Sequence, residues 1–142
     1  MHADVTGVEV IELTAVTDPR GDLAAAELSD VLPFAVARVF TVYNVPDTKV
    51  RGEHAHRRCH QFLVCVAGAV TLGVDDGRRR ARYRLDRPTI GVHLAPMVWG
   101  TQFDYTADAV LVVFASHRYD ADDYIRDYDE FLAAAASAGG SP

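Results

Sequence analysis

Short segments rich in β-branched and aromatic residues recur along this chain, and residues that favour turns separate them. Several short strands at regular spacing, with little helix between them, are typical of a β-sandwich or β-barrel. Residues 75–77, Asp-Asp-Gly, have the chemistry of a tight hairpin turn between two such segments. The strands that we expect are 8–13, 35–43, 62–66, 69–74, 81–85, 91–94 and 109–115.

The hydrophobic period changes only near the C-terminus. Asp120 has the side chain of a helix N-cap and acidic residues follow it, so we expect a helix over 120–125 that 127–136 extend or restart. Nearer the N-terminus, 17–22 is a predicted turn, and the Ala-rich residues 23–28 are predicted to form a short helix or an irregular segment. The whole chain, 1–142, is therefore predicted to be a single all-β domain, with a barrel over about 8–118 and a helical tail over about 120–137.

Composition limits the partners of the chain. The 142 residues carry a net charge of −6, and the pI is about 5.4, which argues against nucleic acid and anionic membranes as partners. No apolar run approaches the ~18 residues of a membrane span, and the N-terminus lacks the basic and apolar regions of a signal peptide. Cys59 and Cys65 would lie too far apart along one extended strand for a disulfide. A cytoplasmic protein is expected.

The stretch 51–61, Arg-Gly-Glu-His-Ala-His-Arg-Arg-Cys-His-Gln, holds three of the six histidines. Side chains alternate across a strand, so His54 and His56 would point to the same face, with Cβ atoms ~6–7 Å apart. Two imidazoles at this spacing can serve one metal ion or one substrate.

This stretch resembles the first sequence motif of the cupins, small β-barrels of the jelly-roll type. The His-x-His pair of that motif is present at 54–56 and its closing glycine at Gly68, but Gln61 stands where a Glu is usual. The second cupin motif should supply another histidine, whereas residues 96–102 hold none. The fold expected from this resemblance is a cupin jelly-roll β-barrel with a short C-terminal helical tail.

The missing ligands argue against a metal. Open zinc and iron sites take three protein ligands, and a neutral Gln is a poor substitute for a carboxylate. His60 and His93 are further candidate ligands, and His60 has the same parity as His54 and His56. We expect no metal and no other cofactor, which leaves the imidazoles free for proton transfer.

Four motifs occur in a set order and spacing: RGEHAH at 51–56, DDG at 75–77, PMVWGTQ at 96–102 and YIRDYDEF at 124–131. Together they resemble the bacterial dTDP-4-keto-6-deoxyhexose 3,4-ketoisomerases, over about residues 38–132. The resemblance implies a metal-independent cupin that is a homodimer and that makes 3-keto sugars for deoxysugar and deoxyaminosugar pathways. It also implies that His54 and His56 are the catalytic pair, with His56 as the base. Thr41 and Tyr43 lie on the strand where that family carries an active-site tyrosine, so Tyr43 is a catalytic candidate and Thr41 a substrate-binding one.

The proposed substrate, a dTDP-linked 4-keto-6-deoxyhexose, makes further demands on the site. Moving the carbonyl from C4 to C3 through an enediol needs a base near C3, a proton donor near C4 and hydrogen bonds to the oxyanion. Arg51 and Arg38 are candidates for the diphosphate because guanidinium matches phosphate geometry, and Gln61 is a further substrate-binding candidate. Trp99, together with Phe103 and Tyr105, is a candidate slot for the thymine ring, with a place in the core as the alternative.

Two other functions compete with this one. The first is a metal-dependent cupin enzyme, such as a dioxygenase or a metal-assisted isomerase. The second is a cupin that binds a sugar nucleotide without catalysis. Metal content separates the first from the ketoisomerase, and binding of dTDP without proton exchange at C3 would identify the second.

Overall fold

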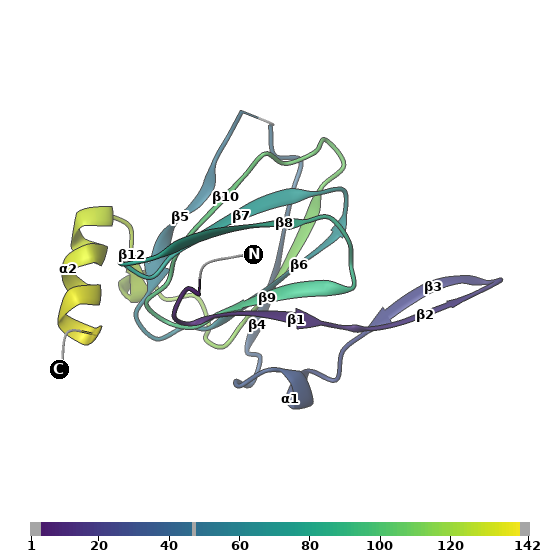
Figure 1. Cartoon of the computed structure of the whole chain (residues 1–142), viewed down its shortest axis with the longest axis horizontal. Helices are drawn as coiled ribbons and strands as arrows, with labels where there is room; N and C mark the ends of the chain where they lie inside the picture. The colour runs from purple at the N-terminus through teal and green to yellow at the C-terminus, as the bar shows by residue number, and fades with distance from the viewer. Residues whose placement is uncertain (1–3, 47, 140–142) are drawn as a thin grey trace.

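The computed structural model describes residues 4–46 and 48–139, and these fold into two five-stranded antiparallel sheets that face each other (Figure 1). The order of the first sheet is β1 (Val8–Glu12), β9 (Ile90–Leu94), β6 (Gln61–Ala67), β11 (Val110–Ala115), β4 (Arg38–Tyr43). The order of the second is β12 (Tyr124–Ile125), β5 (Arg51–His56), β10 (Trp99–Phe103), β7 (Val70–Asp75), β8 (Arg80–Leu85). This arrangement confirms the predicted all-β cupin fold.

The main core lies between the two sheets and follows from the alternation of side chains along each strand. On β11, every second residue is buried, among them Leu111 and Val113 with no exposed surface. Leu63 and Leu72 meet them from β6 and β7. A smaller cluster lies on the outer face of the first sheet, where α1 (Leu28–Val31) and the residues after it cover Phe62 and its neighbours.

The strands β2 (Thr14–Asp18) and β3 (Gly21–Ala25) form a separate two-stranded hairpin that projects from the body of the protein (Figure 1). The predicted turn lies at its tip. The prediction of a helix or an irregular segment over 23–28 is wrong for residues 23–25, which belong to the strand β3. The helix α1 begins only at Leu28. Every residue of β3 is exposed, so the hairpin carries no alternation of buried and exposed positions from which a strand is recognised.

The tail contains a short 3-10 helix η1 (Ala121–Asp123), the strand β12 and the helix α2 (Tyr128–Gly139). Asp120 caps η1, because its carboxylate accepts a hydrogen bond of 3.0 Å from the Asp122 amide. The predicted helix over 120–125 is wrong after Asp123, where the chain pairs with β5 as β12, whereas the predicted second helix is confirmed. Phe131 of α2 is fully buried against the end of the second sheet, so the tail is fixed beside β5.

None of the described helices is long and apolar enough to cross a membrane. The ends of the predicted single domain, 1–3 and 140–142, lie outside the described residues.

Candidate active site

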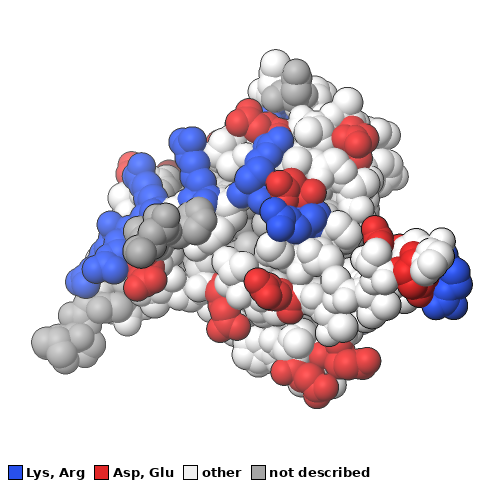
Figure 2. Space-filling model, turned by 45° about the vertical axis from the view of Figure 1, so that its right-hand side comes forward, with Lys and Arg blue, Asp and Glu red and all other residues white. Residues whose placement is uncertain are grey.

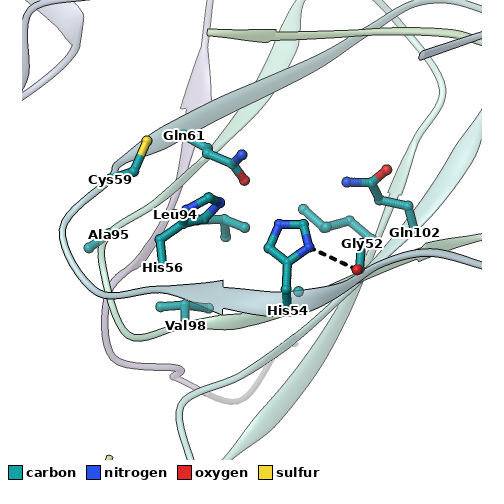
Figure 3. A pocket seen from close by; sticks show the side chains of 11 residues that line it. Gly52, His54, His56, Cys59, Gln61, Leu94, Ala95, Val98 and Gln102 are labelled. Atoms are coloured by element: carbon teal, nitrogen blue, oxygen red, sulfur yellow. Dashed lines mark hydrogen bonds between the residues drawn. The ribbon is translucent and has the colours of Figure 1, made fainter. Parts of the chain in front are cut away.

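A small pocket between the two sheets holds both histidines of the pair predicted to be catalytic (Figure 3). His54 and His56 enter it from β5, Gln61 from the start of β6 and Gln102 from β10. Figure 3 shows the two imidazoles and the two side-chain amides directed into the same space. The two imidazole rings lie edge to face with centroids 4.9 Å apart. The expectation that one face of this strand presents both rings is therefore confirmed.

A bulge in β5 sets the position of His54. Opposite His54, the register with β10 shifts by one residue, and both Gly52 and Glu53 have positive φ angles, of 83° and 51°. Bulges of this kind re-aim a side chain. The bulge turns the Gly52 carbonyl towards the imidazole, and His54 Nδ1 donates a hydrogen bond of 2.8 Å to it. His54 Nε2 is thereby left as the acceptor nitrogen.

The carboxylate of Asp123 holds His56. His56 Nδ1 donates to Asp123 Oδ2 over 3.1 Å, and both residues are about 95 % buried, with 5 % and 4 % of their surfaces exposed. Asp123 also accepts hydrogen bonds from the backbone amides of Arg58 and Cys59, in the turn that follows His56. His56 Nε2 is buried and has no hydrogen-bond partner among the described residues. This nitrogen is the free lone pair that a general base needs.

Both imidazoles are neutral near pH 7. Burial, assisted by the neighbouring His54, lowers the pKa of His56 to about 4, although the Asp123 carboxylate acts in the opposite direction. Burial also lowers the pKa of His54, against the hydrogen bond to Gly52. Burial alone would raise the pKa of Asp123, but its hydrogen bonds from Arg58, His56 and Cys59 lower it. The site thus pairs neutral imidazoles with an ionised carboxylate.

Tyr124 covers both histidines from β12. Its ring centroid lies 4.3 Å from that of His56 and 4.8 Å from that of His54, and the Arg126 guanidinium stacks on its ring at 4.2 Å. The register of β12 with β5 puts Tyr124 directly opposite His56. The tail therefore supplies an aromatic ring against both histidines as well as the carboxylate of Asp123.

Three of the predicted substrate-binding residues lie at or near this pocket. Gln61 lines it and is 94 % buried. Arg38 is close enough for its charge to lower the pKa of His56, and its Nε is buried without a hydrogen-bond partner in the described part of the chain. Arg51 is exposed at the start of β5, opposite Gln102 in the register of the two strands.

The other three predicted site residues lie elsewhere. On β4, Val42 points into the core, so Thr41 and Tyr43 point outward, and Tyr43 is 61 % exposed. On β10, Gly100 and Gln102 face the histidines, so Trp99 lies on the opposite face, where it packs against Tyr128 and Phe131 of α2. The structure therefore does not bring Tyr43, Thr41 or Trp99 to the histidine pocket of the same chain, because alternation along each strand turns them away.

His60 does not join the pair either. The strand β5 ends at His56, and the chain turns before β6 begins at Gln61. His60 is therefore not on the same strand as His54, and its even spacing from His54 does not put it on the same face. His60 Nδ1 lies 2.9 Å from His93 Nε2, and the two rings stack beside Phe34 on the outer face of the first sheet. These two histidines are therefore remote from the pocket.

One group among the described residues has the ligand types of a metal site. A nitrogen of His56, the thiol sulfur of Cys59 and a carboxylate oxygen of Asp123 all lie within 4.8 Å of one another. Nitrogen, sulfur and oxygen ligands of this kind suit zinc. However, His56 Nδ1 already donates to Asp123 Oδ2, so a metal held between these two atoms would replace that hydrogen bond.

Sequence reasoning missed Asp123, Tyr124 and Gln102 as site residues. Asp123 lies 67 residues from His56, and only the pairing of β12 with β5 brings the two together. Tyr124 stands at the start of the YIRDYDEF motif, which pointed to the tail without showing that it reaches the histidines. Gln102 ends the PMVWGTQ motif, which was searched only for a histidine ligand. The strand β10, which carries Gln102 into the pocket, was not predicted.

Comparison with known proteins gives a consistent family. The family described as "FdtA: WxcM-like, C-terminal" matches residues 6–136. TDP-4-oxo-6-deoxy-α-D-glucose-3,4-oxoisomerase from Aneurinibacillus thermoaerophilus is 38% identical over 123 residues, which cover 87% of this chain and 88% of that protein.

Solved structures agree with this match. The structure of QdtA, a sugar 3,4-ketoisomerase from Thermoanaerobacterium thermosaccharolyticum in complex with TDP, superposes with a TM-score of 0.91 at 32% identity, covering 95% of this chain and 98% of that one. WlaRB, a TDP-quinovose 3,4-ketoisomerase from Campylobacter jejuni, gives a TM-score of 0.86 at 34% identity, with coverages of 91% and 99%. The chain belongs to the FdtA family of WxcM-like, C-terminal domains.

Proposed function

We infer that the protein is an isomerase that converts a dTDP-linked 4-keto-6-deoxyhexose to its 3-keto isomer, in deoxysugar biosynthesis. The observation that carries this function is the buried His56, whose Nδ1 is held by Asp123 and whose Nε2 has no hydrogen-bond partner among residues 4–46 and 48–139. Relatives that are TDP-sugar 3,4-ketoisomerases support the same reaction. One relative is a His-to-Asn variant of QdtA in complex with TDP-4-keto-6-deoxyglucose, which supports the choice of sugar nucleotide.

The proposed reaction begins at C3, whose proton is acidic because the C4 carbonyl is adjacent. His56 Nε2 takes this proton, and the electrons of the C–H bond form the C3–C4 double bond while the C4 oxygen becomes an oxyanion. The imidazolium that forms is stabilised by the ionised Asp123 carboxylate, which also fixes the tautomer. Protonation of the C4 oxygen gives the enediol. Delivery of a proton to C4, with loss of the O3 proton, then gives the 3-keto sugar with a hydroxyl at C4, and there is no net change in oxidation state.

His54 is the proposed second participant. Its Nδ1 is fixed on the Gly52 carbonyl, so its Nε2 is the nitrogen free to accept a proton from a sugar hydroxyl. A relay of this kind moves the O3 proton away while C4 receives one. Gln61 and the amide of Gln102 are proposed to hydrogen-bond the sugar oxygens, since both reach the same pocket. Arg38 and Arg51 are the proposed partners of the diphosphate.

The activity is tested by incubating the protein with dTDP-4-keto-6-deoxyglucose and following the sugar by NMR. The 3-keto product, with loss of the C3 proton signal in D2O, is the expected result. Binding of dTDP without exchange at C3 would instead identify a non-catalytic binding protein.

A second candidate function is that of a metal-dependent cupin enzyme, which the His56, Cys59 and Asp123 group favours. We propose that activity needs no metal and therefore survives exhaustive treatment with EDTA. Loss of activity on chelation, with recovery on addition of one particular ion, would establish the metal-dependent alternative.

We further propose that the protein is a cytoplasmic homodimer. The hairpin of β2 and β3 supports a dimer, because it projects from the body and exposes 48 % of Val16 and 57 % of Leu23. Exposed apolar side chains on a projecting hairpin are typical of a surface that packs on a partner. The two cysteines, which are buried free thiols, suit a reducing compartment.

A further inference from the structure

A second cleft, of about 430 Å³, lies on the outer face of the second sheet. Alternation along β10 separates it from the histidine pocket, since Gly100 and Gln102 line one and Trp99, Thr101 and Phe103 line the other. Trp99, which sequence reasoning placed in the substrate site, is a wall of this cleft. Its lining comes from three strands and the first residue of α2.

The register of β8, β7 and β10 explains why the surface is hollow here. Three rows of side chains cross the sheet, and the middle row contains Gly73 between Arg82 and Thr101. The rows on either side end in the large rings of Trp99 and Phe103. Because Gly73 has no side chain, the centre of the middle row leaves a saddle between the two aromatic rings that is open to solvent.

Two arginines, Arg80 and Arg82, line this cleft, and Arg84 lies in the next row of β8. Six of the 14 Lys and Arg residues of this acidic chain lie within 78–87, and Figure 2 shows Lys and Arg side chains in a row along one side of the molecule. Arg80 is fixed by Asp75 and by the Tyr128 hydroxyl, and Arg84 is fixed by the Thr71 hydroxyl and the Asp104 carbonyl.

Arg82, between these two, is different. Its guanidinium lies over the Phe103 ring, 5.3 Å from the ring centroid. In the described part of the chain it pairs with no carboxylate. The Thr101 hydroxyl in the same row likewise forms no hydrogen bond with the described residues. At the centre of a cleft flanked by aromatic rings, a guanidinium and a hydroxyl group therefore lack hydrogen-bond partners among the described residues.

We propose that this cleft binds a nucleoside monophosphate, a planar aromatic ring that carries a phosphate, at a site separate from the histidine pocket. The Arg82 guanidinium matches phosphate geometry. Trp99 lines the cleft with an aromatic ring on which a base can stack, a contact that tolerates any base, while Phe103 holds the Arg82 guanidinium. The volume of the cleft lies in the ordinary range for small-molecule sites.

The chain carries its own reporter for this site, because Trp99 is its only tryptophan. AMP and dTMP are titrated into the protein, and the fluorescence of Trp99 is followed. We expect a saturable change with a Kd of about 1 mM or less. Adenosine, which lacks the phosphate, and ribose 5-phosphate, which lacks the base, should each bind about tenfold more weakly or worse.

Three variants complete the test. Arg82→Gln should weaken AMP binding about tenfold or more, since it removes a charged hydrogen bond to phosphate. Arg87→Gln removes the same charge from a residue that pairs with Asp86 outside the cleft, and should bind like the wild type. His56→Asn should also bind AMP like the wild type, which separates this site from the catalytic one.

The proposal is overturned if Trp99 emission does not respond to AMP, or if AMP and adenosine bind equally. It is overturned equally if Arg82→Gln and Arg87→Gln behave alike, or if His56→Asn abolishes the response. None of these outcomes bears on the isomerase activity, which is assayed separately.

Discussion

Three side chains determine what the histidine pocket can do. His56 is oriented by Asp123, and its Nε2 makes no hydrogen bond to the part of the chain that the structure describes. His54 is oriented by the Gly52 carbonyl. Each ring therefore has one nitrogen fixed on the protein and one available to a ligand. Positioning of this kind makes an ordinary imidazole a useful base.

Asp123→Asn tests whether the carboxylate supports His56. The amide keeps the shape but cannot stabilise an imidazolium and favours the wrong tautomer, so kcat should fall by about 10²–10⁴-fold. Asp120→Asn is the matched control, because Asp120 caps the same short helix without contacting His56. Both variants should remain folded by circular dichroism. Equal activity in the two variants would remove Asp123 from the mechanism.

Burial of His56 also makes stability depend on pH. Its folded pKa of about 4 lies below the ordinary value of 6.5, so the unfolded chain binds the proton more readily than the folded one. This contribution to stability is present above pH 6.5 and is lost as the pH falls towards 4. Between pH 7 and 5 it amounts to about 2 kcal/mol of unfolding free energy.

The measurement is urea unfolding of wild type and His56→Asn at both pH values. The wild type should lose about 2 kcal/mol more than the variant on going to pH 5. An equal loss in both proteins would show that His56 is not held neutral by burial.

At the scale of elements, the bulge in β5 and the pairing of β12 with β5 build the site. The bulge needs Gly52, because its φ is +83° and a Cβ there would lie 3.0 Å from the Gly100 carbonyl oxygen. The pairing of β12 carries Asp123 and Tyr124 to the histidines, and α2 fixes it through the buried Phe131.

Gly52→Ala should therefore cost both stability and activity. A left-handed conformation costs an L-residue about 1–2 kcal/mol, and the close contact with β10 would shift the carbonyl that orients His54. Gly77→Ala, at a φ of +96° in the β7–β8 hairpin, should lose stability but keep activity. The unfolding free energy and the steady-state rate are measured for both variants. Full activity in Gly52→Ala would show that the bulge is not needed.

The sequence was informative where burial imposes a pattern. Short apolar and β-branched runs between turns predicted the strands β6, β7 and β11, and the resemblance of the histidine motif predicted the cupin fold. The spacing of His54 and His56 predicted their shared face. The exposed hairpin of β2 and β3 has no buried face and so gave no such pattern. Asp123 could not be found, because nothing local signals a contact made 67 residues away. Trp99 was misplaced because the direction of β10 side chains depends on a strand that was not predicted.

At the scale of the whole molecule, the projecting hairpin is the feature that a single chain leaves unexplained. Val16 and Leu23 are direct cross-strand partners on one face of it. Light scattering should give twice the chain mass of 15.5 kDa, and Val16→Asp/Leu23→Asp should shift the protein towards monomer, because burying two carboxylates is costly. Ala15→Asp/Ala24→Asp places the same charges on the other face of the hairpin as a control. A wild-type protein of monomer mass at micromolar concentration would refute the dimer.

The central claim is that His56 takes the C3 proton and that His54 assists the second half of the reaction. The most direct measurement is NMR of dTDP-4-keto-6-deoxyglucose in D2O with wild type, His56→Asn and His54→Asn. We predict that His56→Asn loses both C3 exchange and product, by at least ~10²-fold, whereas His54→Asn loses product more than exchange. If His56→Asn still exchanges C3 at the wild-type rate while His54→Asn does not, the assignment of the base is contradicted.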